Sequence, residues 1–167
     1  MLNKKIEKEI NEQIRLELES AYLYLSMSSY LSSINLNGFA HWMRMQFEEE
    51  QMHAMKMYDY VIERGGRIKL EAIASQQDTW NDIIEIFEHT LSHEQGVTAR
   101  INFLVDLAIE ERDHATVNFL QWFIDEQVEE EASVEELLGQ LQLINGKGTG
   151  LFMLDREAKL RTNTPLA

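Results

Sequence analysis

Apolar residues recur along this chain at intervals of three and four, the spacing of one face of an α-helix. The recurrence predicts four long helices, over about residues 3–34, 38–64, 79–110 and 113–144, and a short one over about 151–160. Turn-forming residues separate them, at 35–38, at Gly65-Gly66 and at 145–150. The single proline, Pro165, lies outside all of these helices. The pattern predicts an all-α protein.

The lengths of the connections predict how the helices are arranged. The turn at 35–38 and the break near 110–113 make the helices on either side antiparallel neighbours. The connection at 67–78 is longer, since about 12 residues reach about 40 Å when extended at ~3.3 Å per residue. It can run the length of the bundle and leave the second and third helices parallel. We expect one domain over residues 1–167, a four-helix bundle with a long crossover between helices two and three and a short C-terminal fifth helix.

The first helix carries a second apolar face beside its core stripe. Leu16, Leu23, Met27 and Tyr30 share this face, and Ile10 belongs to the stripe. A helix with two apolar faces buries both of them. We therefore expect this face to contact another subunit, in a homo-oligomer.

Composition narrows the classes of function. The net charge of −14 argues against nucleic-acid partners and anionic membranes, and it favours cations. The absence of cysteine excludes disulfides, iron–sulfur clusters and thiolate metal sites. No apolar run approaches the ~20 residues of a membrane span, and the N-terminal residues are too charged for a signal peptide. We expect a cytoplasmic protein without a membrane partner.

Acids and amides interrupt each long apolar stripe close to its middle. Residues at mid-height of every helix meet in one layer of a bundle, whichever way each helix runs. Burying an ionised carboxylate costs several kcal/mol without a compensating partner, and no seam position carries lysine or arginine. A metal ion would supply the missing positive charge. The interrupting residues are Glu17, Glu50 with His53, Glu94, and Gln127 with Glu130.

Solvated acids or a buried salt-bridge network would account for this layer less well than a metal. Most of the 29 acidic residues are expected on solvated faces, but glutamate is almost never fully buried unless it is paired. A buried salt-bridge network would need a basic residue in the seams. Carboxylates with a single imidazole instead favour a cation such as iron, manganese or zinc. Four carboxylates and one histidine could hold two divalent ions, with Glu50 placed to bridge them.

Residues beside the layer allow more than one interpretation. Tyr24, two turns from Glu17 on the same face, is either a packed core residue or a phenol next to the metal. Glu49, Glu126 and Glu129 adjoin the layer in sequence but turn off the seam. They form either a solvated acidic patch or a third cation site. The histidines at positions 89 and 93 also lie off the seam, and we expect them at the surface.

Taken together, these residues resemble a known family. The chain is similar to the ferritins, and in particular to the bacterial haem-free type, over essentially its whole length. The resemblance rests on Glu17, Tyr24, Glu50-Gln51-Met52-His53, His93-Glu94-Gln95, and the stretch from Asn118-Phe119-Leu120-Gln121-Trp122-Phe123 to Glu126-Gln127-Val128-Glu129-Glu130.

The resemblance implies roles for individual residues. Glu17, Glu50, His53 and Glu94 match ferroxidase-centre ligands, with Glu50 bridging. Glu130 matches a ligand of the second iron, Gln127 the nearby amide, and Glu49, Glu126 and Glu129 a third iron site. The implied activity is oxidation of Fe(II) by O2 or H2O2 and storage of ferric oxyhydroxide in a shell of 24 subunits. Gln51 stands where bacterioferritins place a haem-binding methionine, so haem is not expected.

Two further classes of protein remain compatible with the sequence. One is a carboxylate di-iron oxidase or peroxidase acting on a small substrate, although the chain has no Cys-x-x-Cys module for electron entry. The other is a purely structural acidic bundle, which would show no saturable iron binding.

Overall fold

The computed structural model describes residues 2–163, and over this range the chain forms five α-helices and no β-strand. None of the helices in this range is long and apolar enough to cross a membrane. The prediction of an all-α bundle is confirmed. The helices are α1 (Lys4–Ser33), α2 (Asn37–Glu63), α3 (Ile83–Glu110), α4 (His114–Leu143) and α5 (Gly148–Ala158).

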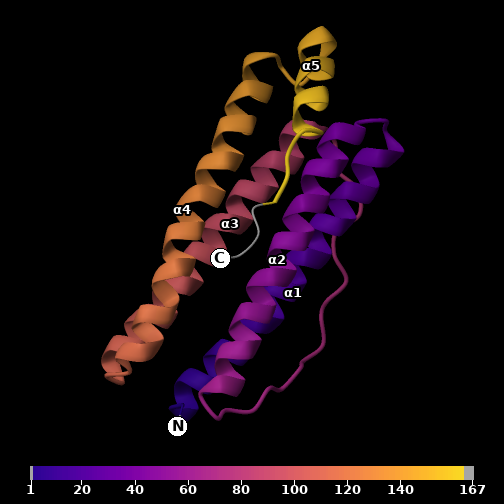
Figure 1. Cartoon of the computed structure of the whole chain (residues 1–167). Helices are drawn as coiled ribbons and strands as arrows, with labels where there is room; N and C mark the ends of the chain where they lie inside the picture. Colours follow the sequence, from indigo (N-terminus) through magenta and orange to yellow (C-terminus); the bar gives the residue numbers. More distant parts are fainter. Residues whose placement is uncertain (1, 164–167) are drawn as a thin grey trace.

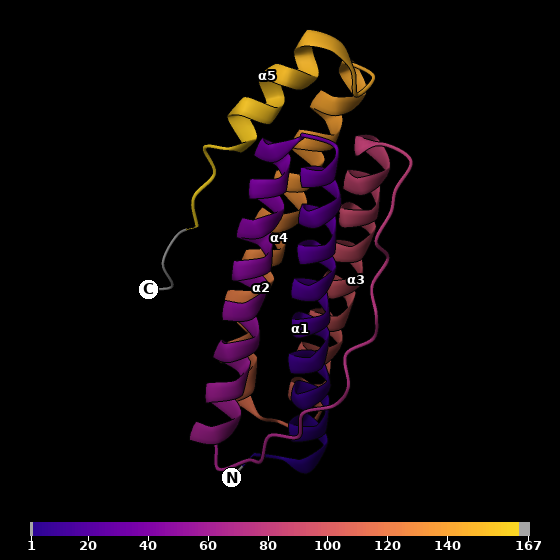
Figure 2. The same ribbon diagram turned by 90° about the vertical axis from the view of Figure 1, so that its right-hand side faces the viewer.

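The four long helices form two antiparallel hairpins, α1 with α2 and α3 with α4 (Figure 1). The segment between α2 and α3 runs the length of the bundle, and Figure 2 shows it along the side of α1 and α3. This crossover makes α2 and α3 parallel, as the length of the connection predicts. The short α5 lies across the end of the bundle where α2 begins (Figure 2).

The apolar core is divided into two clusters. One lies toward α5 and includes Leu31, Met43, Phe87 and Leu141, one from each long helix. The other lies toward the opposite end and, in the same way, draws on all four helices, with Ile10 from α1. On each helix the polar residues of the predicted layer fall between these two clusters. The interruption seen in the sequence is therefore a real gap in the apolar core.

Side-chain caps fix where the helices begin. Asn3 accepts a hydrogen bond from Lys5 N (2.8 Å) at the start of α1. The prediction that the third helix begins near Thr79 is wrong by four residues. Asp82 accepts from Glu85 N (2.9 Å), and Glu85 in turn accepts from Asn81 N (2.5 Å), so the helix starts only at Ile83.

A glycine allows α5 to dock on the start of α2. The Asp155 carboxylate on α5 accepts hydrogen bonds from the backbone N–H groups of Gly38 (2.8 Å) and Phe39 (3.0 Å). These N–H groups belong to the first turn of α2, which has no side-chain cap of its own. A Cβ at position 38 would lie 1.5 Å from Asp155 O, so only glycine fits. The fifth helix begins at Gly148, three residues before the predicted start.

The second apolar face of α1 is covered in part within the chain itself. Leu23 and Met27 are buried, and Thr90 on α3 donates to the Met27 sulfur (3.5 Å). Tyr30 packs edge-on against Trp80, with ring centroids 5.4 Å apart, but Tyr30 and Leu16 stay partly exposed. Contact of this face with another subunit stays a prediction, which Leu16 and Tyr30 can still satisfy. The sequence pattern shows that a face is buried but not which segment buries it.

Candidate metal centre

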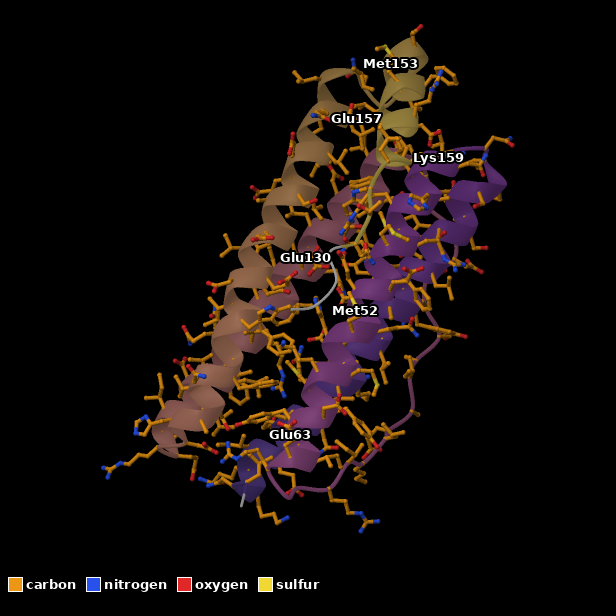
Figure 3. The ribbon with its side chains drawn as sticks, viewed as in Figure 1. Met52, Glu63, Glu130, Met153, Glu157 and Lys159 are labelled. Carbon is orange, nitrogen blue, oxygen red and sulfur yellow. The ribbon has the colours of Figure 1, made fainter. Side chains whose placement is uncertain are left out.

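The polar layer places six side chains from four helices in the middle of the bundle. Each of these residues is at most 5% exposed. Figure 3 shows one of them, Glu130, at mid-height on α4. The helices contribute Glu17 from α1, Glu50 and His53 from α2, Glu94 from α3, and Gln127 and Glu130 from α4.

Glu17, Glu50 and His53 form a group that could hold a metal ion. One ligand atom of each lies within 4.8 Å of the others. His53 Nδ1 is 3.5 Å from Glu50 Oε2, and Gln13 donates to Glu17 Oε1 (2.8 Å). The second oxygens, Glu17 Oε2 and Glu50 Oε2, are buried and lack a hydrogen-bond partner among the described residues. Unsatisfied carboxylate oxygens that converge on an imidazole are the donor set of a hard to borderline cation.

A second group overlaps the first through His53. It consists of His53, Glu126 and Glu130, again with ligand atoms within 4.8 Å of one another. Gln46 donates to Glu130 Oε2 (2.9 Å) and so orients this carboxylate. The rings of Trp122 and Phe123 contact His53 edge-on, with centroids 5.5 and 6.0 Å away. His53 is therefore within reach of both groups and can serve as a ligand in either of them.

Glu94 lies in the layer but in neither group of three. The Tyr24 hydroxyl donates a hydrogen bond to Glu94 Oε1, and Gln127 Nε2 donates to Glu94 Oε2 (3.2 Å). Gln127 is itself a residue of the predicted layer, and Tyr24 is the residue for which the sequence allowed either core packing or a place next to the metal. The two hydrogen bonds hold the Glu94 carboxylate in the bundle interior.

Two buried amides of this centre were missed from the sequence. Gln13 and Gln46 are fully buried and bond to Glu17 and Glu130. Along the chain, Gln13 precedes Glu17 by four residues, and Gln46 precedes Glu50 by four residues. That spacing puts both amides on the core face, so the helical period applied to glutamine would have found them.

The buried carboxyl groups hold protons more tightly than usual. Burial raises the pKa of Glu50 well above its usual range, and the Glu94 and Glu17 carboxylates raise it further. Burial also raises the pKa of Glu94 to about 8, with Glu130 acting in the same direction. Within residues 2–163, no lysine or arginine forms an ion pair with a glutamate of the layer. A bound cation would therefore have to displace protons.

The metal-free protein is expected to lose stability as the pH rises from about 5 to about 8. Because the pKa of Glu94 is about 8 when folded and near 4.5 otherwise, the folded state binds the extra proton across this range. That contribution is complete below pH 4.5 and is lost as the pH passes about 8. Thermal unfolding at both ends of the range measures it, and Zn(II) should reduce the loss. Glu94→Gln should flatten the dependence; an unchanged slope in this variant would contradict the assignment.

The three residues predicted as a third cation site do not behave alike. Glu126 joins the group of His53 and Glu130, whereas Glu129 is exposed and belongs to neither group. Glu49 is largely buried and forms an ion pair with Arg161, from the segment after α5. Burial raises the pKa of Glu49 to about 7, although Arg161 opposes the shift. Their roles as ligands stay predictions.

The prediction that His89 and His93 lie at the surface holds only in part. Both are partly buried, and the His93 ring lies 2.7 Å from Ser20 Oγ and edge-on to the Tyr24 ring. His89 Nδ1 accepts a hydrogen bond from Trp80 Nε1 (3.2 Å). The cause is again Trp80 and the crossover, which cover this side of α1 and α3.

Known proteins resemble the chain over nearly its whole length. Residues 7–144 match the model of a ferritin-like domain. A bacterial non-heme ferritin of Bacteroides fragilis is 41% identical, over 94% of this chain and 98% of its own length. One of Staphylococcus saprophyticus is 38% identical, over 97% of both chains. A structure titled as an engineered closed form of the Archaeoglobus fulgidus ferritin has a TM-score of 0.96 at 50% identity, over 98% of this chain and 100% of that one. A novel open pore ferritin from the same archaeon has the same score and identity over 97% and 100%. The chain belongs to the ferritin family.

Proposed function

We propose that this protein is a ferroxidase that stores iron. The observation that carries the proposal is the pair of overlapping ligand groups at the centre of the bundle, which share His53 and contain unsatisfied carboxylate oxygens. Membership in the ferritin family supports iron as the ion. Two Fe(II) ions each give one electron to O2, which takes up two protons and leaves as H2O2. With H2O2 as oxidant, two Fe(II) ions give one electron each, two protons are taken up, the O–O bond breaks and two water molecules form.

We assign the residues of the layer to these steps. Glu17 and His53 hold the first iron, Glu130 holds the second, and Glu50 bridges the two. Glu94 takes part after turning away from Tyr24 or Gln127, both of which help to position it. The protons that Fe(II) displaces from Glu50 and Glu94 are available for the reduction of the oxidant. Glu126 lies next to His53 and Glu130, where iron leaving the centre can be held.

The wider setting of this activity is also a proposal. We expect 24 copies to form a hollow shell in the cytoplasm that stores ferric oxyhydroxide and has neither nucleic-acid nor membrane partners. Support comes from the names of the relatives, which are bacterial non-heme ferritins, and from the titles of similar structures, which describe open-pore and closed forms of a ferritin. Haem is not expected, since Gln51 follows Glu50.

An anaerobic Fe(II) titration followed by O2 tests the proposal. We expect about two Fe(II) to bind tightly per chain, as the two ligand groups suggest, and to be oxidised when O2 is admitted. Repeated additions should load far more iron than that into an assembly whose mass is then measured. A small oligomer that never holds more than two irons per chain would favour a di-iron oxidase instead. Absence of saturable binding would overturn the metal centre altogether.

A further inference from the structure

The segment after α5 turns back over the bundle. Figures 1 and 2 agree that it descends along α2 on the side opposite the crossover, and Figure 3 labels Lys159 where it starts. Two hydrogen bonds attach its backbone and side chains to α2. His41 Nε2 lies 2.9 Å from Arg161 O, and Asn163 Nδ2 donates to Met45 O (3.0 Å). This anchoring directs the Arg161 side chain toward the middle of the bundle.

The Arg161 guanidinium reaches the carboxylate of Glu49. It donates a hydrogen bond to Glu49 Oε2 and lies over the Trp42 ring, 4.2 Å from the centroid. Both partners of the ion pair are mostly shielded from water, with 18% and 15% of their side chains exposed. A planar guanidinium that is both paired and stacked is held in a defined place.

Opposing charges meet at this position. The acids that act on Glu49 are Glu130, Glu126 and Glu48, and the cation that acts on it is Arg161. Glu130 and Glu126 belong to the ligand group around His53. Arg161 therefore balances negative charge at the edge of the centre, and it does so through Glu49, one of the residues predicted from the sequence to hold a third cation.

We propose that Arg161 is a built-in competitor of the third metal ion. The inference rests on the proposed function and concerns the regulation of the same centre. Because the Arg161 guanidinium lies against Glu49 Oε2 and its positive charge repels a cation, a third ion binds more weakly while this pair is intact than after the side chain withdraws. Within residues 2–163 no arginine pairs with Glu17, Glu50 or Glu130, so the first two positions fill before the third. The chain end thus sets how readily iron is retained beside the centre.

Calorimetric titration with Zn(II), which does not change oxidation state, tests this competition on the assembled protein. Arg161→Gln is expected to tighten the third ion about tenfold, a typical coupling between two sites, and to leave the first two unchanged. The matched control is Arg156→Gln on α5, whose exposed side chain faces Phe152 rather than the centre. The control should bind like the unmodified protein.

Two further variants separate competition from a structural role of the tail. Arg161→Lys keeps the charge and should stay near the unmodified affinity. Asn163→Ala removes one anchor and should tighten the third ion slightly. Unchanged or weaker third-ion binding in Arg161→Gln, with the assembly intact by mass, would overturn the inference. Failure of the first two ions to bind in the unmodified protein would instead overturn the proposed function, so the two failures are distinguishable.

Discussion

Replacing Glu50 with alanine is expected to slow Fe(II) oxidation by about a hundredfold or more, since even residues that only support a metal ligand contribute 10–100-fold. Glu50 contacts His53 and shares a ligand group with Glu17, so its loss removes the carboxylate that we propose as the bridge between the two iron ions. Stopped-flow absorbance after mixing the Fe(II)-loaded protein with O2 measures the rate.

The same substitution is expected to leave the fold intact and to stabilise the metal-free protein. Glu50 carries a buried oxygen without a hydrogen-bond partner and lies among other carboxyl groups. Glu135→Ala, at an exposed position on α4, is the control and should change neither rate nor stability. Unchanged oxidation in Glu50→Ala and in His53→Ala would exclude this layer as the place of reaction.

Replacing Gly38 with alanine is expected to detach α5 from the bundle. The new Cβ would lie 1.5 Å from Asp155 O, a backbone atom that cannot move alone, so the whole of α5 must shift. The shift also breaks the two hydrogen bonds that Asp155 accepts from the first turn of α2. Overpacking of this kind costs about 3 kcal/mol. Faster tryptic cleavage after Arg156 and Lys159 reports the detachment, together with a lower thermal midpoint.

A second glycine gives the matched control for this prediction. A Cβ added at Gly139, near the C-terminal end of α4, meets nothing within 4 Å. Alanine there should stabilise the helix by up to about 1 kcal/mol, the difference between the two residues in a helix interior. Equal behaviour of the two variants would mean that α5 is not held at Gly38.

The sequence predicted the layer because helical periodicity is a local property. Each interruption, such as Glu94 between Phe87 and Ile101, is visible from neighbours on the same helix. Height along the bundle then follows from helix length alone. The number of helices, the parallel arrangement of α2 and α3 and the membership of the layer all rest on such local information.

The errors concern contacts between distant parts of the chain. Arg161 pairs with Glu49 across 112 positions, and no periodic pattern marks that pairing. Trp80 covers the second face of α1 for the same reason: where the crossover comes to rest depends on packing rather than on its own sequence. The late start of α3 has a different cause. The Asp82 side chain accepts from Glu85 N and the Glu85 side chain accepts from Asn81 N, and these local bonds replace the backbone bonds of a helix that would begin earlier.

The division of the core into two apolar clusters bears on how the layer between them could bind a metal ion whose size changes. The clusters around Phe87 and around Ile101 fix the spacing of the helices at both ends. Between them, amides such as Gln46 bond to carboxylates instead of interlocking with apolar neighbours. An iron ion becomes smaller when it is oxidised, and in the ferroxidase that we propose the ligands of this middle section could follow it inward by exchanging one hydrogen bond for another. Such an ion could be bound and released without repacking either half of the bundle.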